Sequence, residues 1–533
     1  MSNHSLPSSC CALFVVLSLG SASPATAQGF RESWRWNLAC TNFAFDFQNN
    51  LCCNTVGPTT DYYAHKIDPH GDEIWVQSYG DPQEVDHSHW VAVDSLGNVV
   101  LTGHQHGPTG GMLTVKFSAN GAVLWADVRL GGEGYRVEVD AADNVYVAGR
   151  VFGGNGNDFL TVKYDPAGNV LWERQRDFFQ NDDSPNALAV SPNGRVAVTG
   201  GSSSDMATVV YDTNGNELFA DWRLASSGSS DVAIAPDGAV YVCGISVNLA
   251  ALVVRFDPAG TQSWAVENTG PNGPFAFARR LAIDSLGNVV AAGHGDSLTP
   301  YMDWVVFKVD PSGSVLWTRT HDGFAGNEEF ATAVTIGARD EIYVAGSAGA
   351  TCQAVRGLGL VVIRFAADGA TDWTHEAPCS GGLPTTVGLD SFGELVVGGG
   401  SSIGTAIRID QEQWTSAGLA LVGPSGAAEL DIRGYFDPSA TAVVTLDRAL
   451  SHTVGAHFFG FARVDFPFMG GTLVPRPDLA LSFVTDGSGG HAVTLALPSF
   501  IPVATEIWVQ TWLLDPAAPQ GLIASNAVVR ALQ

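Results

Sequence analysis

The chain has few basic residues: 26 Lys and Arg stand against 54 Asp and Glu among 533 residues, which gives a formal net charge of −28. Such a charge repels phosphate backbones, so nucleic acid is not expected as a partner. Charged residues of both signs make up only 15% of the chain, whereas 45% is hydrophobic. That hydrophobic content can fill a core, which argues against a disordered acidic protein.

Long apolar runs are also missing, since no segment reaches the ~20 apolar residues that a membrane-spanning helix needs. The N-terminal stretch CALFVVLSLGSASPATAQGF is shorter, and its Ala-Thr-Ala tripeptide at residues 25–27 suits signal peptidase, although no Lys or Arg precedes it. We therefore expect residues 1–27 to be a signal peptide, and the mature protein to be secreted, extracellular or periplasmic, without a membrane span.

Glycine, by contrast, is abundant, with 61 residues, and it recurs within two interleaved phrases. LAIDSLGNVVAAG at 281–293 is typical of one phrase. The other, LTVKYDPAGNVLW at 160–172, returns with variations as LVVRFDPAGTQSW at 252–264 and VVFKVDPSGSVLW at 305–317. It ends in an aromatic residue at eight places: Trp75, Trp125, Trp172, Phe219, Trp264, Trp317, Trp373 and Trp414.

Each phrase predicts a β-hairpin, because β-branched and aromatic residues alternate on both sides of Asp-x-x-Gly-Asn or Asp-Pro-x-Gly. In these turns Asp accepts backbone N–H bonds, Pro presets φ and Gly supplies a positive φ. Two hairpins make a strand-only unit of about 47 residues, which is typical of a β-propeller. We expect eight blades, with seven as the alternative. The recurring Trp should fill the space between blades, and FRESWRWNL (30–38) could complete the last blade from the N-terminus.

The succession DFLTVKYDPAGNVLW…ALAVSPNGRVAVTG resembles the bacterial SBBP-type β-propeller repeat over about residues 40–414. The resemblance implies the fold and carries no catalytic motif. We expect the propeller to occupy residues 28–414. After Trp414, alternating strands of another spacing predict an antiparallel β-sandwich over residues 415–533. Within it, ARVDFPFMGGTLVPRPDL and VQTWLLDPAAPQGLIASNAV resemble a C-terminal module of large secreted proteins of planctomycete-type bacteria, which implies no known activity.

Six cysteines follow the expected signal peptide: Cys40, Cys52, Cys53, Cys243, Cys352 and Cys379. Export permits disulfides, and we predict one between Cys352 and Cys379, which lie in loops of one repeat. Cys243 lies within a strand and is expected to be a small buried residue. The pairing of Cys40, Cys52 and Cys53 stays open.

The second repeat carries two His-x-His pairs, in DHSHW (86–90) and TGHQHG (102–107). If its first hairpin folds between Leu96 and Gly97, His89 faces His104 and His87 faces His106. Four clustered imidazoles suit Zn²⁺ or Cu²⁺, and four exposed loop histidines are the alternative.

Three acidic or polar loops are expected on the same face of the propeller: NDD (181–183), HGD (294–296) and NEE (327–329). Carboxylates that converge there could bind Ca²⁺ or hydrolyse a glycosidic bond. The alternative is that these loops are simply solvated.

The sequence favours a non-enzymatic, monomeric binding protein that presents propeller loops to a protein, a polysaccharide or an envelope component. It shows no His-Glu-x-x-His and no phosphate-binding loop. An extracellular hydrolase or lyase acting on a polymer is the alternative. A minor one is a quinoprotein-like oxidoreductase, since vicinal cysteines and eight Trp-bearing blades are similar to quinoprotein dehydrogenases. However, Cys52 and Cys53 fall within a strand, and the repeats lack the Thr-Gly-Lys turn of those enzymes.

Overall fold

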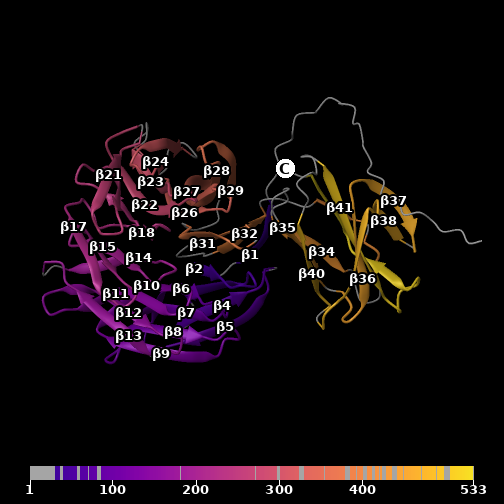
Figure 1. Ribbon diagram of the computed structural model, residues 1–533, viewed down its shortest axis with the longest axis horizontal. Helices are drawn as coiled ribbons and strands as arrows, with labels where there is room; N and C mark the ends of the chain where they lie inside the picture. Colours follow the sequence, from indigo (N-terminus) through magenta and orange to yellow (C-terminus); the bar gives the residue numbers. More distant parts are fainter. Residues whose placement is uncertain are drawn as a thin grey trace, which may run out of the picture.

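The computed structural model describes residues 31–531 apart from the stretches 37–39, 57–60, 70, 81–83, 85, 180–181, 271, 297–300, 323–328, 353–354, 378–383, 392, 400–404, 411–414, 419, 423–427, 435–440, 448, 470, 488 and 497–504. Every regular element within this part is a β-strand (Figure 1). The expected signal peptide lies outside the described residues. So does Cys379, and with it the predicted disulfide to Cys352.

Seven four-stranded antiparallel sheets follow one another along the chain, and in each of them four consecutive strands pair in order. The first four sheets are β2 (Cys40–Phe45), β3 (Leu51–Val56), β4 (Tyr62–Ile67) and β5 (Glu73–Tyr79); β6 (His87–Val93), β7 (Val99–Gln105), β8 (Gly111–Phe117) and β9 (Val123–Leu130); β10 (Gly132–Val139), β11 (Val145–Phe152), β12 (Asn157–Tyr164) and β13 (Val170–Arg176); and β14 (Asp183–Val190), β15 (Val196–Ser202), β16 (Asp205–Tyr211) and β17 (Glu217–Arg223). The next three are β18 (Asp231–Ile234), β19 (Val240–Ile245), β20 (Ala251–Phe256) and β21 (Gln262–Asn268); β22 (Ala276–Ile283), β23 (Val289–Asp296), β24 (Met302–Val309) and β25 (Val315–His321); and β26 (Phe330–Ile336), β27 (Ile342–Cys352), β28 (Val355–Phe365) and β29 (Thr371–Ala377).

The eighth four-stranded sheet joins the two ends of this series. It consists of β30 (Thr386–Leu389), β31 (Leu395–Gly399), β32 (Thr405–Asp410) and, as its outer strand, β1 (Arg31–Trp36). The N-terminal strand therefore completes the last sheet, as the sequence suggested, and Trp414 lies outside the described residues. The innermost strands contact one another around the series, and β2 contacts both β6 and β30. The eight sheets thus close into a β-propeller, with indigo strands beside orange ones in Figure 1.

The hairpin turns follow the predicted chemistry. Between β6 and β7, one carboxylate oxygen of Asp94 accepts the N–H groups of Leu96 (3.0 Å) and Asn98 (2.9 Å). Gly97 in the same turn has a φ of 75°. In the first sheet Asn49 takes the place of this glycine with a φ of 62°, which asparagine tolerates better than most residues.

The recurring tryptophan connects the first, second, third, fifth and sixth sheets each to the next one. The indole N–H of Trp172 donates to the carbonyl oxygen of Thr213, in a turn of the following sheet, at 3.0 Å. Gly215 of that turn lies against the indole, because a Cβ there would come within 2.7 Å of the Trp172 ring. The same indole bond recurs from Trp75 to Ala119, Trp125 to Pro166, Trp264 to Pro311 and Trp317 to Ala367. The predicted role of the tryptophan between blades is therefore confirmed. The indole ring also explains the glycine in this turn, because a larger residue would collide with the ring.

In the fourth sheet another side chain makes the connection to the next sheet. Phe219 stands where the other sheets have tryptophan, so no indole N–H reaches the next turn. The guanidinium of Arg195 instead donates to the carbonyl oxygens of Gly238 (3.0 Å) and Pro258 in the fifth sheet.

Buried ion pairs fix several of the turns. Lys116 pairs with Asp94 at 2.8 Å, with both side chains about 1% exposed. Lys66 with Asp46, and Lys308 with Asp284, repeat this pair at the same distance in two other sheets.

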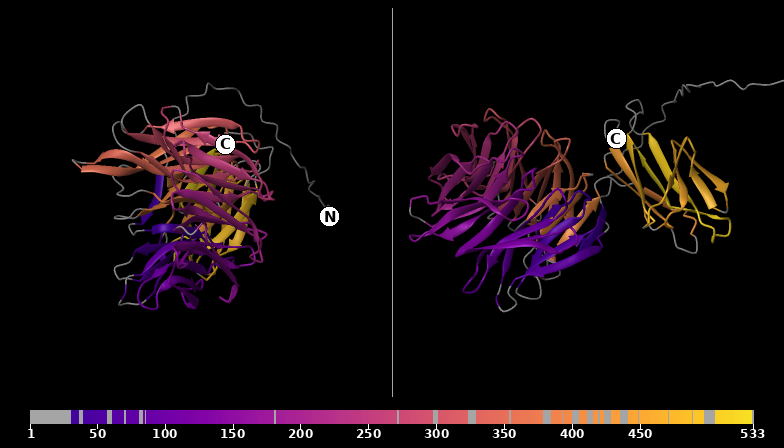
Figure 2. Two further views of the ribbon diagram at one scale, coloured as in Figure 1. Left: turned by 90° about the vertical axis from the view of Figure 1, so that its left-hand side faces the viewer. Right: turned by 60° about the horizontal axis from the view of Figure 1, so that its bottom comes forward.

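The C-terminal strands form a second body beside the propeller (Figures 1 and 2). One sheet contains β33 (Thr415–Gly418), β43 (Ala527–Ala531), β41 (Glu506–Leu514), β36 (Val454–Gly460), β39 (Leu479–Val484) and β42 (Leu522–Ala524). A second contains β34 (Glu429–Gly434), β35 (Thr441–Asp447) and β40 (His491–Ala496), and β37 (Arg463–Phe468) with β38 (Gly471–Pro475) forms a hairpin. Leu446 of the second sheet and Val509 of the first belong to one apolar core. The two sheets thus share one core, and the β-sandwich stays a prediction for this part of the chain.

Among the described residues, the structure contains no apolar helix of membrane-spanning length.

Candidate functional site: the axial channel

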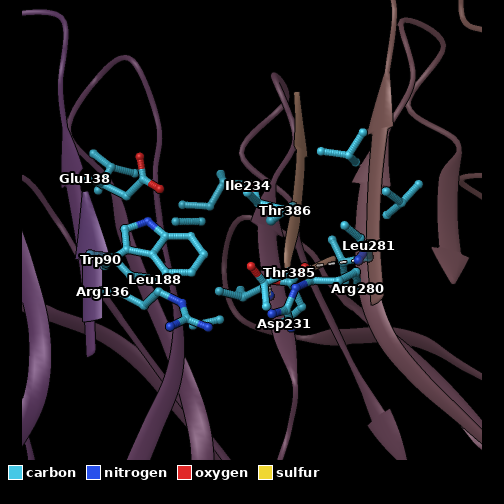
Figure 3. A pocket seen from close by; sticks show the side chains of 18 residues that line it. Trp90, Arg136, Glu138, Leu188, Asp231, Ile234, Arg280, Leu281, Thr385 and Thr386 are labelled. Atoms are coloured by element: carbon cyan, nitrogen blue, oxygen red, sulfur yellow. Dashed lines mark hydrogen bonds between the residues drawn. The ribbon is translucent and has the colours of Figure 1, made fainter. Parts of the chain in front are cut away.

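The innermost strands surround a cavity of about 390 Å³ (Figure 3). Its lining comes from β6, β10, β14, β18, β22 and β26 and from the start of β30. Most lining residues are alanine, valine, leucine or isoleucine. The exceptions are an aromatic residue, four charged residues and two hydroxyl residues: Trp90, Arg136, Glu138, Asp231, Arg280, Thr385 and Thr386.

Irregularities in the inner strands place three of these side chains. The register between the first two strands of a sheet shifts immediately before Trp90, Arg136 and Arg280. Such a bulge adds a residue to one strand and re-aims the side chains beside it. The three side chains therefore occupy corresponding positions in the second, third and sixth sheets.

Glu138 occupies a position at which several other sheets have a small residue. Two residues after the corresponding positions, the second, fourth, fifth and sixth sheets have alanine: Ala92, Ala189, Ala233 and Ala282. The third sheet has a carboxyl group instead, which lines the cavity beside Arg136 (Figure 3).

The two channel arginines have no carboxylate partner. Across the described residues, neither Arg136 nor Arg280 forms an ion pair, and each donates one hydrogen bond to a main-chain carbonyl oxygen, at Tyr135 and Arg279 respectively (3.0 Å each). The Cζ atom of Arg136 lies 4.0 Å from the centroid of the Trp90 ring, which is cation–π geometry.

Asp231 is held by the backbone rather than by an arginine. Its carboxylate accepts the N–H groups of Val232 and Leu281, both at 3.0 Å, and Figure 3 shows the latter bond. Burial raises the pKa of Asp231, although the charge of Arg280 and these N–H groups oppose the shift.

Protonation of the channel changes near neutral pH. Burial raises the pKa of Glu138 to about 7; the charge of Arg136 opposes this and that of Asp231 adds to it. Burial and the positive charge of Arg280 lower the pKa of Arg136 to about 9, so this guanidinium stays protonated at pH 7. When Glu138 is neutral, the two guanidinium groups outnumber Asp231, the one other acidic residue of the lining, and the channel carries a net positive charge.

The predicted register of the histidine hairpin is wrong. His87 pairs with His104 rather than with His106, because the register shift between Ser88 and Trp90 displaces every pair beyond it. The rings of His104 and His106 stack with centroids 4.3 Å apart, and the ring of His87 lies edge-on to that of His106 at 5.7 Å.

His89 lies outside this cluster and packs against the third sheet. Its Nδ1 lies 3.0 Å from the carbonyl oxygen of Gly134, and its ring stacks on Tyr135 with centroids 5.5 Å apart. Burial lowers its pKa. The structure thus brings together three of the four histidines. In the described part of the chain, the groups of three or more ligand atoms within 4.8 Å of one another do not include them, and metal binding at this cluster stays a prediction.

Residues 294–296 (HGD), which were predicted to be a loop, are the last three residues of β23 and have structural roles. His294 is buried against the rings of Phe277 and Phe330, and burial, together with the charge of Arg279, lowers its pKa to about 4. Asp296 accepts the N–H of Phe275 at 3.0 Å.

Four of the described cysteines, Cys40, Cys52, Cys53 and Cys243, are buried free thiols. Cys243 is a buried strand residue, as predicted. Burial raises the pKa values of Cys52 and Cys53, which keeps both thiols protonated at neutral pH, and neither residue lines the axial cavity.

The sequence did not point to the charged residues of the channel. A usable signal was present for Glu138, since VEVDAADN carries a charge where VAVDSLGN and LAIDSLGN have alanine. Arg136 and Arg280 are placed in the channel by the bulges that precede them, and the sequence does not show these bulges.

No known family model matches the chain, and no curated protein sequence matches it. Among solved structures it is similar to the Dos1 propeller (TM-score 0.49, 11% identity, covering 72% of this chain and 95% of that one). It is also similar to the WD40 β-propeller domain of Doa1 (TM-score 0.40, 12% identity, 72% and 98%). A third similar structure is a protein of unknown function from Bacteroides caccae (TM-score 0.33, 12% identity, 62% and 96%). With TM-scores below 0.5, these likenesses carry no conclusion about what this chain binds.

Proposed function

We propose that this chain is a secreted, non-enzymatic binding protein whose axial channel holds a small carboxylate-bearing ligand, such as the acidic end of an envelope saccharide. The observation that carries the proposal is the pair of half-buried guanidinium groups, Arg136 and Arg280, which lack a carboxylate partner in the described structure. Partly buried charges are unfavourable unless an opposite charge compensates them. A bound carboxylate would supply that charge.

The volume of the channel and the net charge of the protein favour a small ligand. About 390 Å³ lies within the usual range for small-molecule sites. The net charge of −28 repels long polyanions, so an acidic group is expected to enter as a single unit or as a chain end.

The polar lining offers complementary contacts for a sugar acid. A guanidinium group can hold a carboxylate through two parallel hydrogen bonds. The Asp231 carboxylate, with lone pairs beyond its two N–H bonds, can accept from sugar hydroxyls, and Thr385 and Thr386 can donate or accept.

Removing either channel arginine should weaken binding of D-glucuronic acid. We expect the wild-type chain to bind this probe and to bind D-glucose much more weakly in titration calorimetry at pH 5. Arg136→Met and Arg280→Met should each lower the affinity about 10- to 100-fold, since a charge-assisted hydrogen bond contributes ~1.5–3 kcal/mol. Arg223→Met is the matched control, because Arg223 lies on an outer strand paired with Asp221. Equal affinities for the two sugars, or no effect of either channel variant, would reject the proposal.

Binding should also weaken as the pH rises through 7. At pH 5 Glu138 is neutral, whereas at pH 8 it is charged and repels a carboxylate ligand. We expect about tenfold weaker binding of D-glucuronic acid at pH 8 than at pH 5, since a like charge a few ångströms away raises the free energy of the complex by ~1–2 kcal/mol. Glu138→Gln should bind equally at both pH values. Glu133→Gln, on the same strand but paired with Arg150, should keep the wild-type profile. A wild-type profile that is flat would contradict this role of Glu138.

One feature of the channel favours the enzymatic alternative. Glu138 and Asp231 line the same cavity, and a carboxyl with a pKa of about 7 suits general acid catalysis. A hydrolase or lyase using these groups would release reducing ends or unsaturated products from an acidic polysaccharide, and Glu138→Gln would abolish the release. Binding without product formation supports the non-enzymatic role.

A further inference from the structure

Three carboxylates meet where the third and fourth sheets join. Asp158 lies on β12, Asp177 directly follows β13, and Asp183 begins β14. One carboxylate oxygen from each of them lies within 4.8 Å of those from the other two. Asp158 and Asp183 are 7% and 0% exposed, whereas Asp177 is exposed to solvent.

The buried carboxylate of Asp183 is incompletely satisfied. Its Oδ2 accepts the N–H of Phe178 at 2.6 Å, while its Oδ1 accepts no hydrogen bond from the described residues. The nearby hydroxyl of Ser202 donates to the carbonyl oxygen of Phe178 instead, at 3.0 Å. No Lys, Arg or His of the described residues forms an ion pair with Asp158 or Asp183; Asp158 accepts an N–H from the neutral amide of Gln175 at 2.6 Å. The buried Oδ1 of Asp183 therefore has no donor in the described structure, and neither Asp158 nor Asp183 has a basic side chain that would compensate its charge, which is unfavourable for buried carboxylates.

The same arrangement recurs where the sixth and seventh sheets join. Asp303 on β24, Asp322 after β25 and Glu329 before β26 also offer one oxygen each within 4.8 Å of one another. Again the first and third carboxylates are buried, at 5% and 1% exposure, and the middle one is exposed. The strand register places the two groups in the same way. In the first group, Asp158 precedes Phe159, and Asp177 follows the residue that pairs with Phe159. In the second group, Asp303 precedes Trp304, and Asp322 follows the residue that pairs with Trp304.

The junction between the first and second sheets provides an internal comparison. Asp61 and Asp86 correspond to Asp158 and Asp183, but Gly80 stands in the place of Asp177. A Cβ on Gly80 would come within 2.4 Å of a carboxylate oxygen of Asp86 and within 3.2 Å of one of Asp61. This junction holds two carboxylates without the exposed third.

We propose that the two carboxylate groups, Asp158 with Asp177 and Asp183, and Asp303 with Asp322 and Glu329, each bind one calcium ion. All the ligand atoms are carboxylate oxygens, which suit a hard divalent cation rather than Zn²⁺ or Cu²⁺. Ca²⁺ accepts irregular sets of six to eight oxygens, so water and main-chain carbonyls can complete each site. Each ion would bridge two neighbouring sheets, since two ligands come from one sheet and its outgoing end and the third from the next sheet.

The test is a calcium titration of the full mature chain after treatment with a chelator, in the absence of any sugar. We expect two equivalents of Ca²⁺ to bind, with Mg²⁺ binding at least tenfold more weakly, and the melting temperature to rise with Ca²⁺. Asp183→Asn should remove one equivalent, and Asp183→Asn combined with Glu329→Gln should remove both. Asp61→Asn, at the junction that lacks the third carboxylate, should keep two.

Folding of the variants can be separated from calcium binding. Asp183→Asn removes a buried negative charge from three carboxylates that repel one another. In the presence of chelator this variant should therefore melt at or above the wild-type temperature, and calcium should no longer raise its melting temperature through this site. A wild-type chain that takes up no Ca²⁺ would overturn the proposal. So would uptake that is unchanged in the double variant, because the ions would then lie elsewhere.

Discussion

Replacing Arg408 by methionine should destabilise the propeller by about 3–5 kcal/mol, because it removes the cation from a buried cluster of charges. Arg408 is 2% exposed. Its guanidinium contacts Asp390, which is fully buried, and Glu394, and Nη1 donates to the carbonyl oxygen of Pro69 at 3.1 Å. Arg408 belongs to the eighth sheet and Pro69 to the first, so this residue also joins the two ends of the ring.

Denaturant unfolding followed by tryptophan fluorescence measures the effect as a shift of the midpoint. Arg223→Met is the control, since its ion pair with Asp221 is partly exposed and should contribute ~0–1 kcal/mol. Adding Asp390→Asn to Arg408→Met should recover part of the loss, because it removes one of the buried negative charges. An unchanged midpoint for Arg408→Met would show that the cluster does not stabilise the ring.

Replacing Gly215 by alanine should destabilise the protein by about 3 kcal/mol. Roughly 1 kcal/mol arises from the φ of 77°, which alanine adopts at a cost, and the rest from the collision of the new Cβ with the Trp172 ring 2.7 Å away. Gly154→Ala is the matched control: its φ is 95°, but an added Cβ meets no atom within 4 Å, so only the ~1 kcal/mol backbone effect is expected.

A double variant isolates the contact between sheets. With Trp172→Leu in the background, Gly215→Ala should lose much less stability, because the ring that it strikes is gone. Equal effects of Gly215→Ala and Gly154→Ala in the wild-type background would mean that the tryptophan does not constrain the turn.

The propeller fold could be predicted because its determinants are local and repeated. Asp94 and Gly97 define a turn by their own chemistry, and alternation of β-branched residues defines the strands on either side. The position of Trp172 between sheets also followed from its recurrence. Its hydrogen bond to Thr213 did not, since this bond depends on how two separate hairpins meet.

The site residues depended on features that the sequence does not display. The bulge between Ser88 and Trp90 changed the partners of His87 and turned His89 toward the third sheet. The same kind of bulge places Arg136 in the channel. A one-residue irregularity in an alternating strand leaves no compositional mark, so the facing pairs could not be derived by counting from the turn.

The carboxylate groups were predicted in part. The loops containing Asp183 and Glu329 were identified as acidic loops on one face of the propeller. Their partners, Asp158 and Asp303, lie more than twenty residues earlier, on the third strand of the preceding sheet, and only the packing of adjacent sheets brings them together.

The central claim is that the axial channel is the ligand site, and a crystal structure of the protein with D-glucuronic acid at pH 5 tests it most directly. We expect one molecule in the cavity, with its carboxylate in contact with the guanidinium group of Arg136 or Arg280 and its hydroxyls near Asp231. Sugar bound only to the loops or the outer strands, with water alone beside the two arginines, would contradict the claim.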